Sequence, residues 1–283
     1  MIEVIKPGLY TSIQDKGRFG YENYGVPISG SMDQFSSVLS NKLLNNNEED
    51  GVMEITMTGP VLKFHENSKI SITGADISPQ INNKVVELNR AHFIKQGDVL
   101  SFGKLKYGIR SYLSVLGGFL TKKTMGSRSM CLNVTESFRL YKGQFLKIRP
   151  IKKMVPNSLI KQVDYLNHFK NNNLRVFKGP EFDELSENQK HQIFNKKFTI
   201  SNDNNRMAFQ LNEIFENDLK PIITSLVTQG TVQLTPSGKI IILMRDNQTC
   251  GGYPRILQLN KSTISSLSQK YLKNEIIFEL VNK

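Results

Sequence analysis

Residues 52–81 read VMEITMTGPVLKFHENSKISITGADISPQI, and this stretch decides the predicted fold class. Its short, largely apolar runs end at turn signals, namely Gly59-Pro60, His65-Glu66-Asn67 and Gly74-Ala75-Asp76. Such runs are typical of strands, and many in succession predict a barrel or a sandwich. Because the strands do not alternate with helices, the pattern argues against a doubly wound parallel sheet.

The same pattern continues on both sides of this stretch. Further strands are predicted at 84–88, 99–102 and 109–115. After a Lys- and Asn-rich segment at 151–173, a second β-rich region runs to the C-terminus. We therefore predict a mainly β protein with a few short helices and two domains, 1–150 and 174–283, joined by a linker at 151–173. The dipeptides Gly59-Pro60 and Gly179-Pro180 each follow a strand, which hints at a duplicated barrel.

Three short helices are predicted among the strands. In the first, Ser31 can cap the helix with Gln34 as its reciprocal partner, and residues 45–47, all Asn, end it. The apolar positions of this helix at helical spacing are Phe35, Val38, Leu39 and Leu43. The second helix is predicted at 186–194, with Ser186 as its cap, and the third at 262–272.

The chain is basic, with 37 Lys and Arg against 25 Asp and Glu and a net charge of +12. The lysines are scattered, and no helix-turn-helix or aromatic RNA-binding motif accompanies them. Scattered lysine is typical of a solvated surface, so no nucleic-acid partner is expected. A positive cleft for a phosphate or carboxylate ligand stays open as an alternative.

Cysteine usage and hydropathy bear on the compartment. The two cysteines, Cys131 and Cys250, make no disulfide framework and fit a reducing compartment. Residues 1–5 read as a first strand, without a charged-then-apolar leader. The longest apolar run, 240–244, is far below the ~20 residues of a membrane-spanning helix. We expect a cytoplasmic protein with no membrane partner.

Several well-known site motifs are absent from the sequence. There is neither a phosphate-binding G-x-x-x-x-G-K-[ST] loop nor a G-x-G-x-x-G fingerprint. The four histidines lie far apart, and none has metal-ligand spacing to another His or Cys. The sequence therefore favours neither a zinc site nor a Ser-His-Asp triad.

In the first half, three polar segments are candidates for a site, although each also has a structural explanation. Gln14, Asp15 and Arg18 offer hydrogen-bond acceptors and a bidentate donor beside glycines, where the backbone can approach a ligand. In the structural explanation, Asp15 and Arg18 form a pair that braces the loop. Asp33 lies at a helix start, which binds anions and where a carboxylate also stabilises the helix dipole. Asp76 ends a strand, where aspartate is common in turns.

Two further segments are the most specific. Gly126-Ser127-Arg128-Ser129 places an arginine between two hydroxyl groups. Residues 245–254 read RDNQTCGGYP directly after an apolar strand. So many hydrogen-bonding groups behind a core strand are costly if unpaired, which favours a site. Its candidate residues are Asp246, Gln248, Thr249 and Tyr253. Cys250 is interpreted as a small packed thiol.

These residues together resemble a known family. The matching motifs, in order, are Pro7-Gly8-Leu9, residues 13–18, Gly25-Val26-Pro27, residues 29–33, Glu54 with Thr56, Gly59-Pro60, residues 73–76, Tyr112-Leu113, Gly117-Gly118, residues 126–129, Arg206-Met207, Thr228-Gln229-Gly230, residues 246–249 and residues 251–254. They resemble the biotin-dependent carboxyltransferase-like family, also called allophanate hydrolase subunit 2, and most of all its stand-alone members, which are 5-oxoprolinase subunits. Two departures are Cys250, where Thr is expected, and Ala208, where Gly is usual.

The resemblance implies a fold of two cyclophilin-like β-barrels. It also implies a subunit of an ATP-dependent 5-oxoprolinase, which converts 5-oxoproline, ATP and water to glutamate, ADP and phosphate. Such a chain is expected to be inactive alone and to act with a smaller cyclophilin-like subunit, a third lactam-hydrolase subunit being a further candidate partner. The chain has no Met-Lys-Met biotin-attachment sequence, so no biotin is expected on it and the fused urea carboxylase is disfavoured.

Two other functions stay open, namely a carboxyltransferase component acting on urea- or allophanate-type amides and a non-catalytic regulator that antagonises a kinase inhibitor. A proline isomerase is disfavoured, because a fold does not carry an activity with it.

For the 5-oxoprolinase, the hypothetical roles divide by chemistry. Arg18 and Arg128 would contact anions. Asp33, Asp76 and Asp246 would hold Mg²⁺ or orient the lactam N–H. The remaining candidates, Gln14, Asp15, Gln248, Thr249 and Tyr253, would bind the substrate together with Arg18. Mg²⁺ and ATP are expected to be bound by the complex.

Overall fold

The computed structural model describes residues 1–149 and 166–281. The chain divides into two compact units, Met1–Arg18 with Ser29–Tyr165 and Phe19–Ile28 with Leu166–Lys283. Residues 19–28 thus group with the second unit, although they lie within the segment predicted as the first domain. Of the predicted linker, residues 151–165 lie outside the described residues, and the rest contains helix α2 (Leu166–Lys170) and the start of strand β12.

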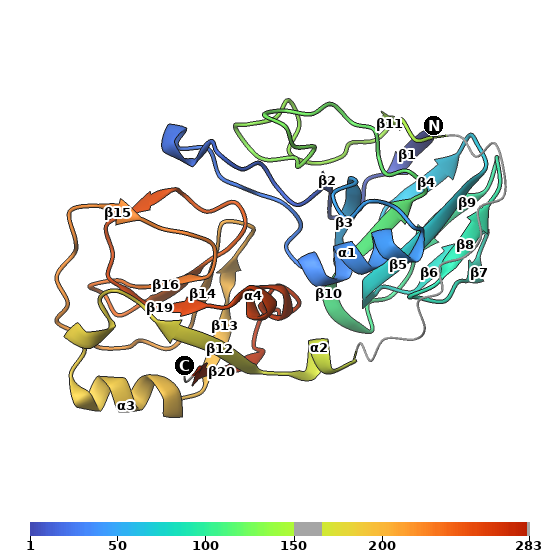
Figure 1. The fold of residues 1–283 in the computed structure, drawn as a ribbon. Helices are drawn as coiled ribbons and strands as arrows, with labels where there is room; N and C mark the ends of the chain where they lie inside the picture. Colours follow the sequence, from blue (N-terminus) through green and yellow to red (C-terminus); the bar gives the residue numbers. More distant parts are fainter. Residues whose placement is uncertain (150–165, 282–283) are drawn as a thin grey trace. The chain divides into compact units, whose positions relative to one another are not determined.

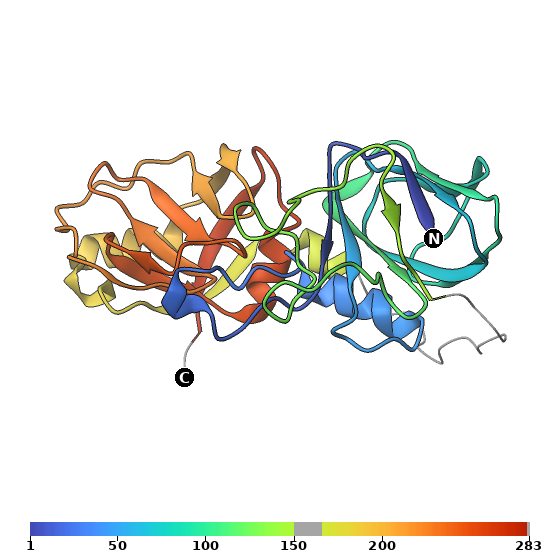
Figure 2. The ribbon, with the colours of Figure 1, turned by 90° about the horizontal axis from the view of Figure 1, so that it is seen from above.

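The first unit is built from two antiparallel sheets (Figure 1). The six-stranded sheet runs in the order β11 (Phe145–Leu146), β1 (Ile2–Lys6), β4 (Val61–Phe64), β9 (Val99–Phe102), β6 (Pro79–Ile81) and β7 (Lys84–Val85). The five-stranded sheet runs in the order β2 (Tyr10–Gln14), β3 (Val52–Thr56), β10 (Tyr107–Val115), β5 (Ser68–Asp76) and β8 (Ala91–Ile94). In Figure 2 these strands surround a common interior.

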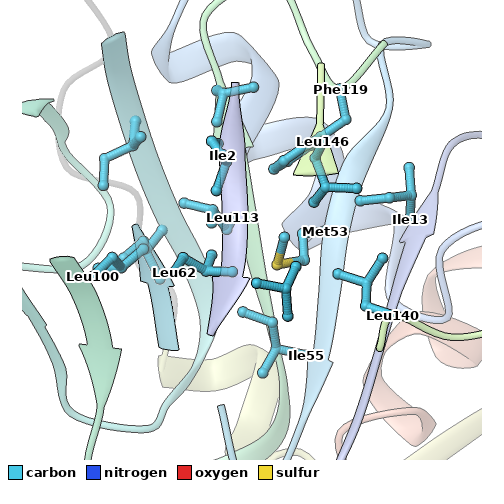
Figure 3. Packing of buried hydrophobic residues seen from close by; sticks show 14 of the residues in the cluster. Ile2, Ile13, Met53, Ile55, Leu62, Leu100, Leu113, Phe119, Leu140 and Leu146 are labelled. Atoms are coloured by element: carbon cyan, nitrogen blue, oxygen red, sulfur yellow. The ribbon is translucent and has the colours of Figure 1, made fainter. Parts of the chain in front are cut away.

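The interior of the first unit is apolar because alternate residues of each strand point inward. Figure 3 shows this cluster, in which side chains from both sheets meet. The labelled members are Ile2, Ile13, Met53, Ile55, Leu62, Leu100, Leu113, Phe119, Leu140 and Leu146, all of them buried. The core therefore fixes the face that each strand presents, and with it the direction of the polar residues at the strand ends.

Helix α1 (Gln34–Leu43) contacts β5 and β10 through hydroxyl groups as well as apolar side chains. Thr73 Oγ1 donates to the Ser36 carbonyl at 2.7 Å, and Ser71 Oγ donates to the Ser40 carbonyl at 2.6 Å. The predicted apolar face is therefore only partly correct. Leu39 and Leu43 are buried, but Phe35 is 44% exposed, because the helix presents its serines to the sheet.

The predicted cap of α1 is wrong. Asp33, not Ser31, caps the helix, and its Oδ1 accepts a hydrogen bond of 3.1 Å from the Ser36 N–H. The Ser31 N–H instead donates to the Asp15 carbonyl at 2.9 Å, so Ser31 belongs to the preceding loop. A contact distant in sequence thus decides where the helix begins.

The second unit contains a closed barrel of seven strands. Their order is β12 (Asn173–Lys178), β19 (Arg255–Leu259), β16 (Thr231–Leu234), β17 (Ile240–Leu243), β14 (Ala208–Leu211), β13 (Phe198–Asn204) and β20 (Glu275–Leu280). Strands β12 and β20 pair in parallel and the other neighbours antiparallel. A separate two-stranded sheet pairs β15 (Ser225–Leu226) with β18 (Cys250–Gly251).

Short helices complete the second unit. Helix α3 (Glu187–Asn195) has the predicted cap, because Ser186 and Gln189 form a reciprocal capping box. Helix α4 (Lys261–Leu267) is capped by Asn260 and ends before the predicted limit of residue 272. Two 3₁₀ turns lie at Glu22–Tyr24 and Phe182–Glu184. The predicted fold class, mainly β with a few short helices, is confirmed.

One strand boundary differs from its prediction in an informative way. The predicted end of strand β5 is Thr73, yet the strand continues through Gly74 to Asp76. Gly74 has a φ of +85°, and a Cβ there would lie 2.5 Å from the Arg110 carbonyl oxygen. The β5–β10 register shifts beside it, so the glycine permits a bulge and is not a turn.

Within residues 1–149 and 166–281, no helix is both long enough and apolar enough to cross a membrane.

Candidate functional site

The carboxylate of Asp15 joins two of the predicted site segments. Its Oδ1 accepts hydrogen bonds of 2.6 Å from both Ser127 Oγ and Ser129 Oγ and one of 2.8 Å from the Gly17 N–H. Its Oδ2 accepts one of 2.6 Å from the Arg128 N–H. We call Asp15, Ser127, Arg128 and Ser129 the Asp15 cluster. Four donors occupy this carboxylate, so in the structure it holds the protein backbone in place.

Arg18 and Gln14 are buried beside this cluster. Arg18 is 1% exposed, its Nη1 donates to Ser29 Oγ at 2.9 Å, and its Nη2 donates to the Ser129 carbonyl. Gln14 Nε2 donates to Ser12 Oγ at 2.9 Å and to the Met130 carbonyl at 3.0 Å. Both side chains were predicted to bind substrate, and the structure places both among protein partners.

A second buried group holds the loop before α1. The Met32 N–H donates to Glu54 Oε2 at 2.7 Å, and the Asp33 N–H donates to Tyr112 Oη at 2.7 Å. Tyr112 Oη in turn donates to Glu54 Oε2 at 2.9 Å. We call Met32, Asp33, Glu54 and Tyr112 the Tyr112 network. All four residues are fully buried.

Burial, followed by the carboxylates of Glu54 and Asp33, holds the pKa of Tyr112 well above its usual range. The phenol therefore stays protonated and donates to Glu54. Glu54 and Tyr112 are site-forming residues that the sequence-based candidates did not include. The sequence did contain a signal for Glu54, because it is an acidic residue inside the apolar strand run VMEIT. A carboxylate buried in a strand needs hydrogen-bonding partners, so such a residue points to a polar network.

The aspartates predicted to hold Mg²⁺ have protein partners. Asp33 Oδ2 accepts from Ser36 Oγ as well, and Asp76 accepts from the Ser78 N–H at 2.8 Å and pairs with Lys106 at 3.1 Å. Asp246 pairs with Arg206. Across the part of the chain that the structure describes, no three His, Cys, Asp or Glu residues come together as a metal site. Each of these three carboxylates is thus held by protein donors, and their role in binding Mg²⁺ stays a prediction.

Arg128 lies beside a pocket in the first unit. The pocket has a volume of about 500 Å³ and is lined by residues from 120–130, 135–137, 141 and 144–147. Arg128 is half-buried, and its Nη1 donates to the Thr121 carbonyl. Of the two predicted anion contacts, Arg128 is therefore the one that faces a pocket, whereas Arg18 is enclosed. We call this cavity the Arg128 pocket.

In the second unit, Asp246 is fixed by a bidentate ion pair. Arg206 Nε lies 2.7 Å from Asp246 Oδ2, and Arg206 Nη2 lies 3.1 Å from Asp246 Oδ1. Both side chains are largely buried. A bidentate Arg–carboxylate pair adds geometric specificity as well as binding energy. Asp246 therefore anchors the turn after β17.

The remaining candidates of the second unit follow this turn. Gln248 and Tyr253 are exposed and Thr249 is half-buried. The Thr249 carbonyl accepts from the Val227 N–H at 3.0 Å. Cys250 is exposed on β18, so its interpretation as a packed thiol is wrong. The reason is that β18 pairs with β15 outside the closed barrel.

Residues 24–280 match the family described as carboxyltransferase domain, subdomain A and B. The chain belongs to this family. The match includes both units and all candidate residues from Asp33 onward. The predicted family is thereby confirmed.

Two curated proteins, each named as a subunit of 5-oxoprolinase, are similar to this chain over nearly their whole length. The Escherichia coli (strain K12) protein is 29% identical over 288 residues, which span 98% of this chain and 90% of that protein. The Haemophilus influenzae protein is 26% identical over 296 residues, spanning 100% of this chain and 92% of that protein. A urea amidolyase of Lachancea kluyveri is 41% identical over 128 residues, only 45% of this chain and 7% of that protein.

Solved structures share the fold of this chain. The Kluyveromyces lactis urea carboxylase has a TM-score of 0.87 and 26% identity, and the match covers 99% of this chain and 27% of that one. TTHA0988 has a TM-score of 0.87 at 24% identity and covers 98% of this chain. This chain spans about half, 55%, of the TTHA0988 chain. The similar proteins thus carry names of more than one activity, so similarity alone does not set the substrate.

Proposed function

We propose that this chain is a subunit of an ATP-dependent 5-oxoprolinase, a hydrolase that opens the cyclic amide of 5-oxoproline to give glutamate. One observation carries the proposal. The two relatives named as 5-oxoprolinase subunits match from end to end, covering at least 98% of this chain and at least 90% of each relative. Two urea amidolyases are higher in identity, at 41% and 31%, and match 45% and 74% of this chain, but these matches span only 7% and 12% of those much longer proteins.

The chemistry explains what the complex must supply. A lactam resists hydrolysis because amide resonance stabilises its carbonyl group. Transfer of a phosphoryl group from ATP to the carbonyl oxygen makes the carbon electrophilic, and this step needs cations around the phosphate and donors for the developing charge. In this proposal Arg128 supplies one such cation, and ATP enters with its own Mg²⁺ as a co-substrate of the complex.

The other candidate residues take two kinds of role in this proposal. Gln248, Thr249 and Tyr253 are the candidates that offer polar side chains near the surface, and we assign them to substrate contact. Asp15, Arg18 and Gln14 position the backbone around Arg128 through the hydrogen bonds described above. Asp33, Asp76 and Asp246 likewise act as positioning residues, since each carboxylate has protein donors.

The proposed complex contains other subunits. The partners are a smaller cyclophilin-like chain and, as a further candidate, a third lactam-hydrolase subunit, and the complex works in the cytoplasm. Both end-to-end relatives are named as subunits of 5-oxoprolinase, which supports a multi-subunit assembly.

A co-purification followed by an activity assay tests the proposal. The chain is expressed with the shorter candidate subunit, and ATP hydrolysis is measured with and without 5-oxoproline. Stimulation by 5-oxoproline, with glutamate as product, is the expected result. A stable complex that releases phosphate equally with and without 5-oxoproline contradicts it.

A second candidate is a carboxyltransferase component that acts on urea-type amides, favoured by the 41% identity to urea amidolyase over 128 residues. In the same assay, urea in place of 5-oxoproline distinguishes the two. The carboxyltransferase function also requires a biotin-bearing partner, so dependence on added biotinylated carrier protein would support it.

A further inference from the structure

We propose that the Arg128 pocket binds the oxyanion of a small substrate, either a carboxylate or a phosphate, on a molecule that also has an apolar body. The pocket lies within the first unit, between the segment after β10 and the segment around β11. The two walls are joined by a backbone hydrogen bond of 2.9 Å from the Leu120 N–H to the Lys147 carbonyl. A volume of about 500 Å³ lies within the range of ordinary ligand pockets.

Arg128 is pre-organised to meet an anion in this pocket. Asp15 fixes its backbone N–H at 2.6 Å, and the Thr121 carbonyl accepts from its Nη1. Its side chain also passes close over Gly51, where an added Cβ would lie 3.2 Å from Arg128 Cδ. Within the described residues, Nε and Nη2 have no further acceptor. A guanidinium held in this way loses little freedom when it binds a planar oxyanion.

The charges on the pocket wall favour an anion. The wall carries three cations, Lys122, Arg128 and Lys147, and one carboxylate, Glu136. Lys122 is paired with Glu136, which leaves Arg128 and Lys147 without a wall carboxylate to balance them. The local charge is therefore positive, and a pocket of one sign concentrates ligands of the other.

Neutral donors and an apolar surface complete the recognition. Thr121 Oγ1 is buried and has no hydrogen-bond partner among the described residues. Among the lining residues, Met130 and Leu146 are buried apolar side chains, while Tyr141 and Phe145 are exposed. A buried hydroxyl without a partner costs free energy, and a ligand oxygen would satisfy it. The wall thus suits a molecule with one oxyanion and an apolar part.

Two substrates of the proposed reaction have this chemistry, and naming them rests on the proposed function. 5-oxoproline carries a carboxylate on a small ring, and an adenine nucleotide carries phosphates beside an aromatic base. The oxyanion site itself follows from the pocket alone.

The chain contains no tryptophan, which allows a sharp test. Tyr141→Trp places a single fluorescent reporter on the pocket wall, and Tyr271→Trp, in the second unit and not on this wall, is the matched control. Full-length chain and assembled complex are titrated with 5-oxoproline, ADP and inorganic phosphate. The expected result is a saturable change at residue 141, and none at residue 271, with either the carboxylate or the phosphate probes. The responding probe identifies the source of the oxyanion.

Charge-matched variants in the Tyr141→Trp background then test the assignment to Arg128. Arg128→Gln is expected to weaken binding roughly tenfold or more, and Lys147→Gln, at an exposed position, a few-fold. Arg90→Gln removes the same charge from an exposed turn outside the pocket and should leave Kd unchanged. No response to any probe in either the chain or the complex overturns the inference, as does equal binding by all three variants. A complex that lacks 5-oxoproline-dependent ATPase but still shows saturable oxyanion binding refutes the proposed function and leaves the pocket assignment intact.

Discussion

The carboxylate of Asp15 and the backbone N–H of Arg128 are joined by a hydrogen bond of 2.6 Å across 113 positions of sequence. The same carboxylate accepts from the hydroxyl groups that flank Arg128 in sequence. Asp15 therefore sets the position of the arginine that faces the pocket. The consequences for stability and for function can be separated by mutation.

Asp15→Asn should destabilise the first unit. One carboxylate oxygen becomes an NH₂ group, which cannot accept from the Arg128 N–H or from the serine hydroxyls. The variant loses a charge-assisted hydrogen bond and leaves a buried donor unsatisfied. Together these changes should lower the unfolding free energy by about 1.5–3 kcal/mol. Urea unfolding measures this, with Asp183→Asn, an exposed site, as the control. A change below about 0.5 kcal/mol, as is typical of surface substitutions, would contradict the role given to Asp15.

Arg128→Lys should impair function although it keeps the charge. A lysine ammonium cannot present the planar fork that binds a carboxylate or phosphate through two bonds. Activity of the complex is expected to fall roughly ten- to a hundredfold, while the melting temperature stays near that of wild type. A variant that melts several degrees lower yet keeps its activity would assign Arg128 to the scaffold, through its bond to Thr121.

Tyr112→Phe should cost about 1–3 kcal/mol of unfolding free energy, because it leaves the buried Asp33 N–H without its acceptor and removes the phenol donor to Glu54, which keeps the Met32 N–H. Tyr24→Phe, at an exposed position, is the control. The raised pKa adds a spectroscopic check. The difference in phenolate absorbance between wild type and Tyr112→Phe should be absent at pH 10 to 11 in the folded protein. An ordinary titration near pH 10 would show that Tyr112 is not enclosed.

The buried Lys270 predicts a dependence of stability on pH. Desolvation lowers its pKa in the folded state to about 8, from 10.5, and Lys270 is 4% exposed. Between these two values the unfolded chain binds more protons than the folded one. The contribution of Lys270 to stability therefore rises as pH increases from about 8 to about 10.5.

Comparison of wild type with Lys270→Met isolates this effect. The unfolding free energy of wild type relative to the variant should rise by about 1–3 kcal/mol from pH 7.5 to pH 10. Lys261→Met, at an exposed position of α4, serves as the control and should show no such rise. A wild-type advantage that is flat or falls over this range would show that Lys270 titrates normally.

The chain alone should show negligible ATPase activity, since it carries no phosphate-binding loop of the G-x-x-x-x-G-K-[ST] type. Light scattering at micromolar concentration should reveal a stable complex with the shorter partner chain. Robust 5-oxoproline-stimulated ATP hydrolysis by the purified chain would refute the need for a partner. Absence of association would favour the regulator that antagonises a kinase inhibitor.

Local signals in the sequence determined the elements whose residues interact with near neighbours. Strands Val61–Phe64 and Val99–Phe102 lie where their apolar runs and turns predict them. The capping box of α3 joins Ser186 and Gln189, which are three positions apart, so no distant contact competes with it. The ordered motifs likewise sufficed to place the chain in its family.

Tertiary contacts decided the rest. Ser31 has the residue type of a helix cap, but its N–H is bound by the Asp15 carbonyl, and the helix begins after Asp33 instead. Gly74 has the residue type of a turn, yet the Arg110 carbonyl of the neighbouring strand makes it a bulge within β5. Arg18 and Arg128 look alike as sequence candidates, and only the fold encloses one and turns the other toward a pocket. Propensity describes what a residue can do locally, whereas burial and the pairing of distant polar groups select which of those options the folded chain adopts.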